Sequence, residues 1–132
     1  MKLVHISLLA IVALSLNAAA DEPKVSAQPV RTVLERHDQS GVPGKEIVIG
    51  TAMLPGGAAF GYHTHAGDEI GYVLQGTLTL KTRGQPDRTL KAGDSFFNPR
   101  GAVHSVIAGP DGATALSTWI IDKGQPLATP VP

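Results

Sequence analysis

Turn-forming residues recur along this chain at roughly eight- to twelve-residue intervals, and this spacing constrains the fold more than any other feature. Fifteen glycines and ten prolines in 132 residues supply these turns, for example at Pro55-Gly56-Gly57 and at Gly109-Pro110-Asp111-Gly112. The segments between them are short, are rich in Val, Ile and Thr, and show no amphipathic helical period. About eight or nine short strands separated in this way predict an all-β sandwich or barrel.

The chain length allows one domain, which we expect over residues 30–122. Alternation of apolar and polar residues places the strands within it. The expected strands cover residues 30–35, 46–54, 58–65, 69–75, 77–82, 89–93, 95–98, 103–108 and 113–122. The tail, residues 123–132, holds three prolines and is therefore not expected to form a central strand or a helix.

The first twenty residues have the composition of a secretory signal peptide. Lys2 precedes an apolar run over residues 3–16, and Ala18-Ala19-Ala20 offers a cleavage site after Ala20. A membrane anchor is the alternative, but the run is short for a span of about 20 residues. We therefore expect a periplasmic or secreted protein that has no membrane attachment after cleavage. Residues 21–29 are polar and are expected to form a flexible arm.

Charge and cysteine content exclude several classes of function. Eleven basic and eleven acidic residues give zero formal charge, so no nucleic-acid partner is expected. The absence of cysteine excludes a disulfide scaffold, a thiolate metal site and a cysteine nucleophile.

The stretch from Gly57 to Gly76 contains the residues that carry chemistry. His63 and His65 are two residues apart, so on a strand both imidazoles point to the same face. Glu69 follows a turn-like break at residues 66–68 and begins the next strand. Two imidazoles and a carboxylate on adjacent strands make most of a divalent-metal site, and His104 is a fourth candidate ligand.

These residues resemble the two sequence motifs of the cupin family. The first motif is matched at every spacing by Gly57, His63, His65, Glu69 and Gly76, and the second by Gly93, Pro99, Gly101 and His104. Ala108 stands where the second motif ends in asparagine. The resemblance covers about half of the chain that follows the leader. It implies a single-domain double-stranded β-helix, which is a small jelly-roll barrel.

Three imidazoles and one carboxylate suit one divalent transition metal, namely Mn, Fe, Ni, Cu or Zn, and do not suit Ca. Four protein ligands leave a position open for water, oxygen or a bidentate oxygen ligand. The resemblance implies a metal-dependent enzyme of dioxygenase, isomerase, decarboxylase or lyase type acting on a small oxygen-rich molecule. A non-enzymatic periplasmic ligand-binding module and a sensory or interaction module remain alternatives, as does a metal-free barrel whose histidines only line a cavity.

The other residues near the motifs have less specific expected roles. Arg100 is expected to be a solvated loop residue rather than a receptor for an anion, and His37 a surface histidine. Phe96, Phe97 and Trp119 are expected in the core or the pocket wall. Asp68 and Asp94 are expected in turns, and no catalytic or substrate-binding side chain is assigned.

Alternation also predicts which side chains face outward. On strand 69–75, Glu69, Gly71, Val73 and Gln75 are expected to point inward. The outward set comprises Ile70, Tyr72 and Leu74, joined by Phe60 and Tyr62 of the preceding strand. Soluble monomers seldom expose an apolar patch larger than a few hundred Å². We therefore expect a homodimer that buries this patch, unless residues 30–35 cover it within one chain.

Overall fold

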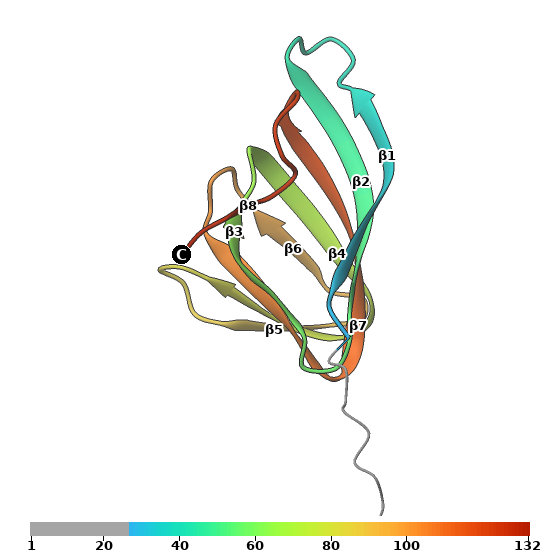
Figure 1. Ribbon diagram of the computed structural model, residues 1–132, viewed down its shortest axis with the longest axis vertical. Helices are drawn as coiled ribbons and strands as arrows, with labels where there is room; N and C mark the ends of the chain where they lie inside the picture. The colour runs from blue at the N-terminus through green and yellow to red at the C-terminus, as the bar shows by residue number, and fades with distance from the viewer. Residues whose placement is uncertain (1–26) are drawn as a thin grey trace, which may run out of the picture.

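Short strands and glycine turns produce an antiparallel all-β barrel in the computed structural model, which describes residues 27–132 (Figure 1). Those residues contain no helix, and thus none long and apolar enough to cross a membrane. The eight strands are β1 (Val30–Asp38), β2 (Lys45–Leu54), β3 (Ala59–Thr64), β4 (Gly67–Thr82), β5 (Arg88–Lys91), β6 (Ser95–Asn98), β7 (His104–Asp122) and β8 (Thr129–Pro130). The expected signal peptide at residues 1–20 and most of the arm at 21–29 lie outside the described residues.

Two long strands organise the sheet. Its order is β1-β2-β7-β3-β8, and β4 pairs with β5, β6 and β7. The first half of β4 pairs with the second half of β7, and residues 78–82 of β4 pair with residues 104–108 of β7. Figure 1 shows β7 bending near the bottom of the view, so that its two halves belong to two walls of the barrel.

The expectation of separate strands at 69–75 and 77–82, and at 103–108 and 113–122, is wrong. Gly76 and Gly112 have φ angles of 72° and 81°, which makes a bend in each strand. The two bends lie side by side, and β4–β7 pairing, interrupted at residues 109–112, resumes beyond them from Leu78 and Ala108. A Cβ atom on Gly76 would stand 2.0 Å from the Gly112 carbonyl oxygen, so only glycine allows this close approach. The turn signals therefore mark kinks inside β4 and β7.

Alternation along β4 holds over its first half. Glu69, Gly71 and Val73 are buried, and Ile70, Tyr72 and Leu74 are exposed by 54%, 47% and 47%. The inward expectation for Gln75 is wrong, because the β4–β7 register shifts between Val73 and Gln75 and leaves Gln75 exposed.

Two aromatic residues also depart from expectation. Phe60 packs against the apolar core, because the register of β3 shifts between Phe60 and His63. Phe97, expected in the core or pocket wall, is 54% exposed and pairs with Ile70 on the outer face. Phe96 and Trp119 are buried as expected.

The described residues form two apolar clusters in the interior. The larger contains Leu54, Val73, Leu78, Leu80, Leu90, Phe96, Ala108, Ala113 and Ala115. The smaller contains Val48, Trp119 and Ile121. Because Ala108 lies in the larger cluster, the position where the motif has asparagine is filled by core packing and not by a polar group.

Candidate metal centre

Three strands bring the four expected ligands together. His63 lies near the end of β3 and is the cross-strand partner of His104 at the start of β7. His65 follows β3 directly, and Glu69 lies in β4. All four side chains are buried, with 2% to 6% of each residue exposed.

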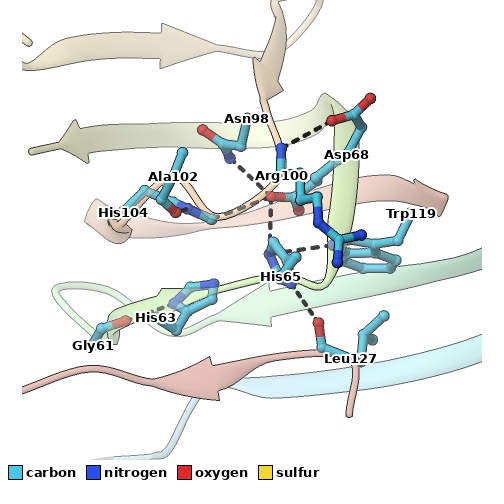
Figure 2. A network of polar contacts seen from close by, with 11 residues as sticks. Gly61, His63, His65, Asp68, Asn98, Arg100, Ala102, His104, Trp119 and Leu127 are labelled. Atoms are coloured by element: carbon cyan, nitrogen blue, oxygen red, sulfur yellow. Dashed lines mark hydrogen bonds and ion pairs between the residues drawn. The ribbon is translucent and has the colours of Figure 1, made fainter. Parts of the chain in front are cut away.

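The three imidazoles converge on one point. One ring nitrogen from each of His63, His65 and His104 lies within 4.8 Å of the other two. The carboxylate oxygen Oε2 of Glu69 lies 3.2 Å from Nε2 of His65 and 3.3 Å from Nε2 of His104. Figure 2 shows the rings grouped inside the barrel.

Backbone carbonyls fix the tautomer of all three rings. Nδ1 of His63 donates to the Gly61 carbonyl at 2.7 Å, and Nδ1 of His104 donates to the Ala102 carbonyl at 2.9 Å. Nδ1 of His65 donates to the carbonyl of Leu127, in the tail (Figure 2). Because a carbonyl oxygen can only accept, Nδ1 carries a proton in each ring, and Nε2 is the nitrogen that could bind a metal in the neutral ring. This arrangement is the usual support for metal-binding histidines.

Two side chains contact the candidate ligands, Asn98 at the Glu69 carboxylate and Trp119 at the His65 nitrogen that a metal would take. Asn98 donates its amide to Glu69 Oε2 at 2.8 Å, and the Trp119 indole N–H donates to Nε2 of His65 at 3.3 Å. Burial alone would raise the pKa of Glu69, but the ring nitrogens of His104 and His65 and the Asn98 amide lower it below its ordinary value. Glu69 is therefore a carboxylate.

His63 is held neutral. Burial is the main cause of a pKa of about 4 for His63, and the Gly61 hydrogen bond opposes this lowering. Repulsion from His104, His65 and Arg31 lowers the pKa further. A neutral imidazole is the form that binds a metal. The site thus gathers lone pairs and one negative charge, the donor set that a cation satisfies.

The available space fits one ion. The cavity beside His63, Glu69 and His104 has a volume of about 20 Å³, enough for one water-sized sphere. His63, His104 and Glu69 line this volume, and His65 lies beside Glu69. Three imidazoles and a carboxylate in this arrangement fit a divalent transition metal. A larger hollow of about 460 Å³ lies around the bends of β4 and β7, but it shares only Leu54 with this cavity and holds none of the four residues.

An open groove adjoins the cavity. It has a volume of about 270 Å³ and is lined by Arg31, Phe60, Gly61, Tyr62, His63, Ala128 and Pro130. Arg31, Phe60 and His63 line both spaces, so they form the wall between the ion-sized cavity and the solvent-facing groove. A small molecule in this groove would lie next to His63.

Comparison with known families agrees with this geometry. Residues 50–121, more than half of the chain, match the model of the cupin domain family. The chain belongs to the cupin family. The expected all-β jelly-roll fold is therefore confirmed, and the four candidate ligands lie on the two motifs by which the sequence resembled cupins.

Individual cupins differ in how much of this chain they resemble. A curated relative, the dimethylsulfoniopropionate lyase DddQ of Ruegeria pomeroyi, is 32% identical over 66 residues, which are 50% of this chain and 33% of that protein. The chain thus spans about a third of the length of this curated relative. A cupin-like protein from Thermotoga maritima superposes with a TM-score of 0.64 at 26% identity, covering 78% of this chain and 75% of the other. The solved structure of DddQ gives a TM-score of 0.64 at 22% identity, with 86% and 57% covered, and shows the fold alone.

Other expected residues lie near the cupin site without entering it. The Arg100 backbone N–H donates to Asp68, and its guanidinium binds the Ala66 carbonyl at 2.7 Å and the Asp122 carboxylate (Figure 2). These contacts link the loop that carries Arg100 to β7 and use its hydrogen-bond donors, so Arg100 is not a receptor for an anion. His37 is exposed, as expected.

Sequence reasoning missed Arg31 and Asn98. Arg31 is the second residue of β1, where an arginine in an alternating strand usually marks a solvated face, and only the pairing of β1 with β2 brings it to the cavity. Asn98 ends β6 opposite Glu69, a pairing that could have been found only from the strand register.

Proposed function

We propose that this cupin binds one divalent transition metal through His63, His65, His104 and Glu69, and acts as a metal-dependent enzyme on a small oxygen-rich molecule. The observation that carries the proposal is the convergence of three imidazoles with one carboxylate beside two of them, next to an ion-sized cavity. When bound, the metal would supply a Lewis acid. The groove beside His63 has room for a small molecule.

Lyase chemistry is the reaction type that we propose first. Its support is the likeness of half of this chain to a dimethylsulfoniopropionate lyase. An elimination needs a base to take a proton from carbon while the bond to the leaving group breaks. Among the residues that line the groove, Tyr62 and His63 can exchange a proton, and His63 is a proposed ligand. Tyr62 is therefore the proposed proton acceptor, and the Arg83 guanidinium lies 5.3 Å from the centre of its ring.

The test is a turnover assay on metal-loaded protein with dimethylsulfoniopropionate and a panel of small carboxylates. We expect product with the wild type and a loss of about a hundredfold or more in kcat for Tyr62→Phe, at unchanged metal content. Metal binding without turnover of any member of the panel would contradict the enzyme and favour the alternative, a ligand-binding module. Absence of metal binding would contradict both.

Export and pairing complete the proposal. The composition of residues 1–20 supports a leader removed near Ala20, which would place the protein in the periplasm or outside the cell. N-terminal sequencing of the purified protein should give a start near Asp21, and an intact Met1 on cytoplasmic protein would contradict export. A homodimer is supported by the exposed apolar side chains on the outer face of β4 and β6, namely Ile70, Tyr72, Leu74 and Phe97.

A further inference from the structure

Arg31 is a partly buried cation that no carboxylate of residues 27–132 pairs. Its guanidinium carbon lies 4.5 Å from the centre of the Phe60 ring and 5.8 Å from that of Trp119. Within residues 27–132 its Nε is buried without a hydrogen-bond partner, and the side chain forms no ion pair. Aromatic faces offset only part of the loss of hydration of a charge. The remaining hydrogen-bonding capacity of Arg31 is therefore available to a ligand.

The electrostatics of the filled site also require an anion. Imidazoles that bind a metal are neutral, so the filled site would hold one negative charge on Glu69, one positive charge on Arg31 and the two positive charges of a divalent ion, a sum of two positive charges. The walls contributed by Phe60, Phe96 and Trp119 are apolar and offer no counter-charge. A bound anion would remove this surplus.

The groove next to the cavity has a lining suited to an anion. Among residues 27–132, no aspartate or glutamate lines it, and Arg31 is its one cationic lining residue. Burial lowers the pKa of Arg31 somewhat, while the attraction of Glu69 opposes this change. An arginine remains charged even so. The groove thus pairs a fixed guanidinium with an opening of about 270 Å³ that admits only small molecules.

We propose that Arg31 is the anion-binding, specificity-determining residue of this groove and that the molecule bound there is a small carboxylate. The inference rests on the proposed function, since it names the class of substrate for the same site. A guanidinium fork matches the two oxygens of a carboxylate. A phosphate carries further oxygens that need additional donors, and the part of the chain that the structure describes adds no second arginine and no lysine to the groove lining. The carboxylate is therefore the better match.

The test measures binding rather than turnover. Zn²⁺-loaded wild type, Arg31→Met and Arg31→Lys are titrated by calorimetry with acetate, glycolate and malonate, and with inorganic phosphate and glycerol for comparison. Arg88→Met is the matched control, because it removes the same charge from β5, away from the groove. Zn²⁺ affinity is measured for every variant.

We expect wild type and Arg88→Met to bind at least one carboxylate more tightly than phosphate and not to bind glycerol. Arg31→Met should weaken carboxylate binding about tenfold to a hundredfold, the effect of one charge-assisted pair. Its Zn²⁺ affinity should be equal to or higher than that of the wild type, because a nearby cation is removed. A purely structural role would lower both affinities together.

Carboxylate binding by Arg31→Met at wild-type strength would overturn the inference and leave the metal site standing. Tighter binding of phosphate than of any carboxylate would overturn the ligand class. If Arg31→Met does not fold, Arg31→Lys decides: severalfold weaker carboxylate binding supports a role for the guanidinium fork, and unchanged binding contradicts it.

If the wild type takes up no Zn²⁺, the proposed function fails. The same titrations on metal-free protein then decide the role of Arg31: weak carboxylate binding that Arg31→Met abolishes supports it, and no binding overturns it.

Discussion

At the scale of single residues, the hydrogen bonds around the histidines do more than the histidines alone to define the site. Three carbonyls orient the rings, and two of them, those of Gly61 and Ala102, come from two residues before the histidine that they hold. The third comes from Leu127 in the proline-containing tail. The tail, expected only as an extension, therefore supports a proposed ligand and adds the edge strand β8 beside β3.

Asn98 gives a direct test of this outer support. Asn98→Leu removes the amide that donates to Glu69 at 2.8 Å and leaves a side chain of similar size. We expect metal affinity to fall about tenfold to a hundredfold, as when other supports of metal ligands are removed. Equilibrium dialysis with Zn²⁺ measures the change. Unchanged affinity would mean that Asn98 does not orient the carboxylate.

The neutral His63 implies a pH dependence for the metal-free protein. Its pKa is about 4 in the fold, against about 6.5 in the unfolded chain. Between these values the unfolded chain binds more protons, so the free energy of unfolding should fall as pH drops from about 6.5 to about 4. Above pH 6.5 this contribution is fully retained, and Glu69, whose pKa is also lowered, acts in the same direction.

Urea unfolding of the metal-free protein at pH 7 and pH 5 measures this effect. His63→Gln is the control, because it keeps a polar side chain that cannot titrate, and its midpoint should fall less. A midpoint that is unchanged or higher at pH 5 in the wild type would contradict a depressed pKa for His63.

At the scale of elements, the sequence pattern predicted where residues are extended better than it predicted which segments join into one strand. Periodicity located the inward face of β4 up to Val73, because that stretch is regularly paired. Periodicity failed at Gln75 and Phe60, where the register shifts. A bulge is defined by the pairing of two strands, so the sequence of one strand does not reveal it. The grouping of His63, His65 and Glu69 was predictable because their spacing is local, and His104 joined them through the second motif. Arg31 was not predictable, because its place depends on the pairing of β1 with β2.

The paired bends of β4 and β7 can be tested with one glycine. Gly76→Ala places a Cβ atom 2.0 Å from the Gly112 carbonyl oxygen at a φ of 72°. Gly84→Ala is the matched control, with a φ of 79° and no atom within 4 Å. Both should lose about 1 kcal/mol or more from the left-handed backbone. Gly76→Ala should lose clearly more, and equal losses in urea unfolding would show that the bends do not need this close contact.

At the scale of the whole molecule, the outer face of β4 and β6 bears on assembly. The side chains of Ile70, Tyr72, Leu74 and Phe97 are each about half exposed. The N-terminal strand β1 pairs with β2 and does not cover this face. The expected extension of the patch to Phe60 is wrong, since Phe60 packs inward, and Tyr62 lines the groove. The proposed dimer contact is therefore the β4–β6 face.

Charge placed on this face should disrupt the dimer. In Tyr72→Glu/Leu74→Glu two unpaired carboxylates would be buried at the contact, so we expect a monomer or an aggregate by light scattering, where the wild type is a dimer at micromolar concentration. Val42→Glu, in the turn between β1 and β2, is a control on an exposed apolar residue and should remain dimeric. A monomeric wild type would contradict the proposed pairing.

Metal stoichiometry tests the central claim most directly. Trp119 is the only tryptophan, and its indole N–H bonds the same His65 nitrogen that a metal would take, so its fluorescence should report binding. We expect titration of metal-free protein with Zn²⁺ or Mn²⁺ to change this fluorescence and to saturate at one ion per chain, confirmed by elemental analysis. His104→Ala should lose most of the affinity. Folded wild-type protein that binds no ion, or a His104→Ala variant with full metal content, would contradict the account.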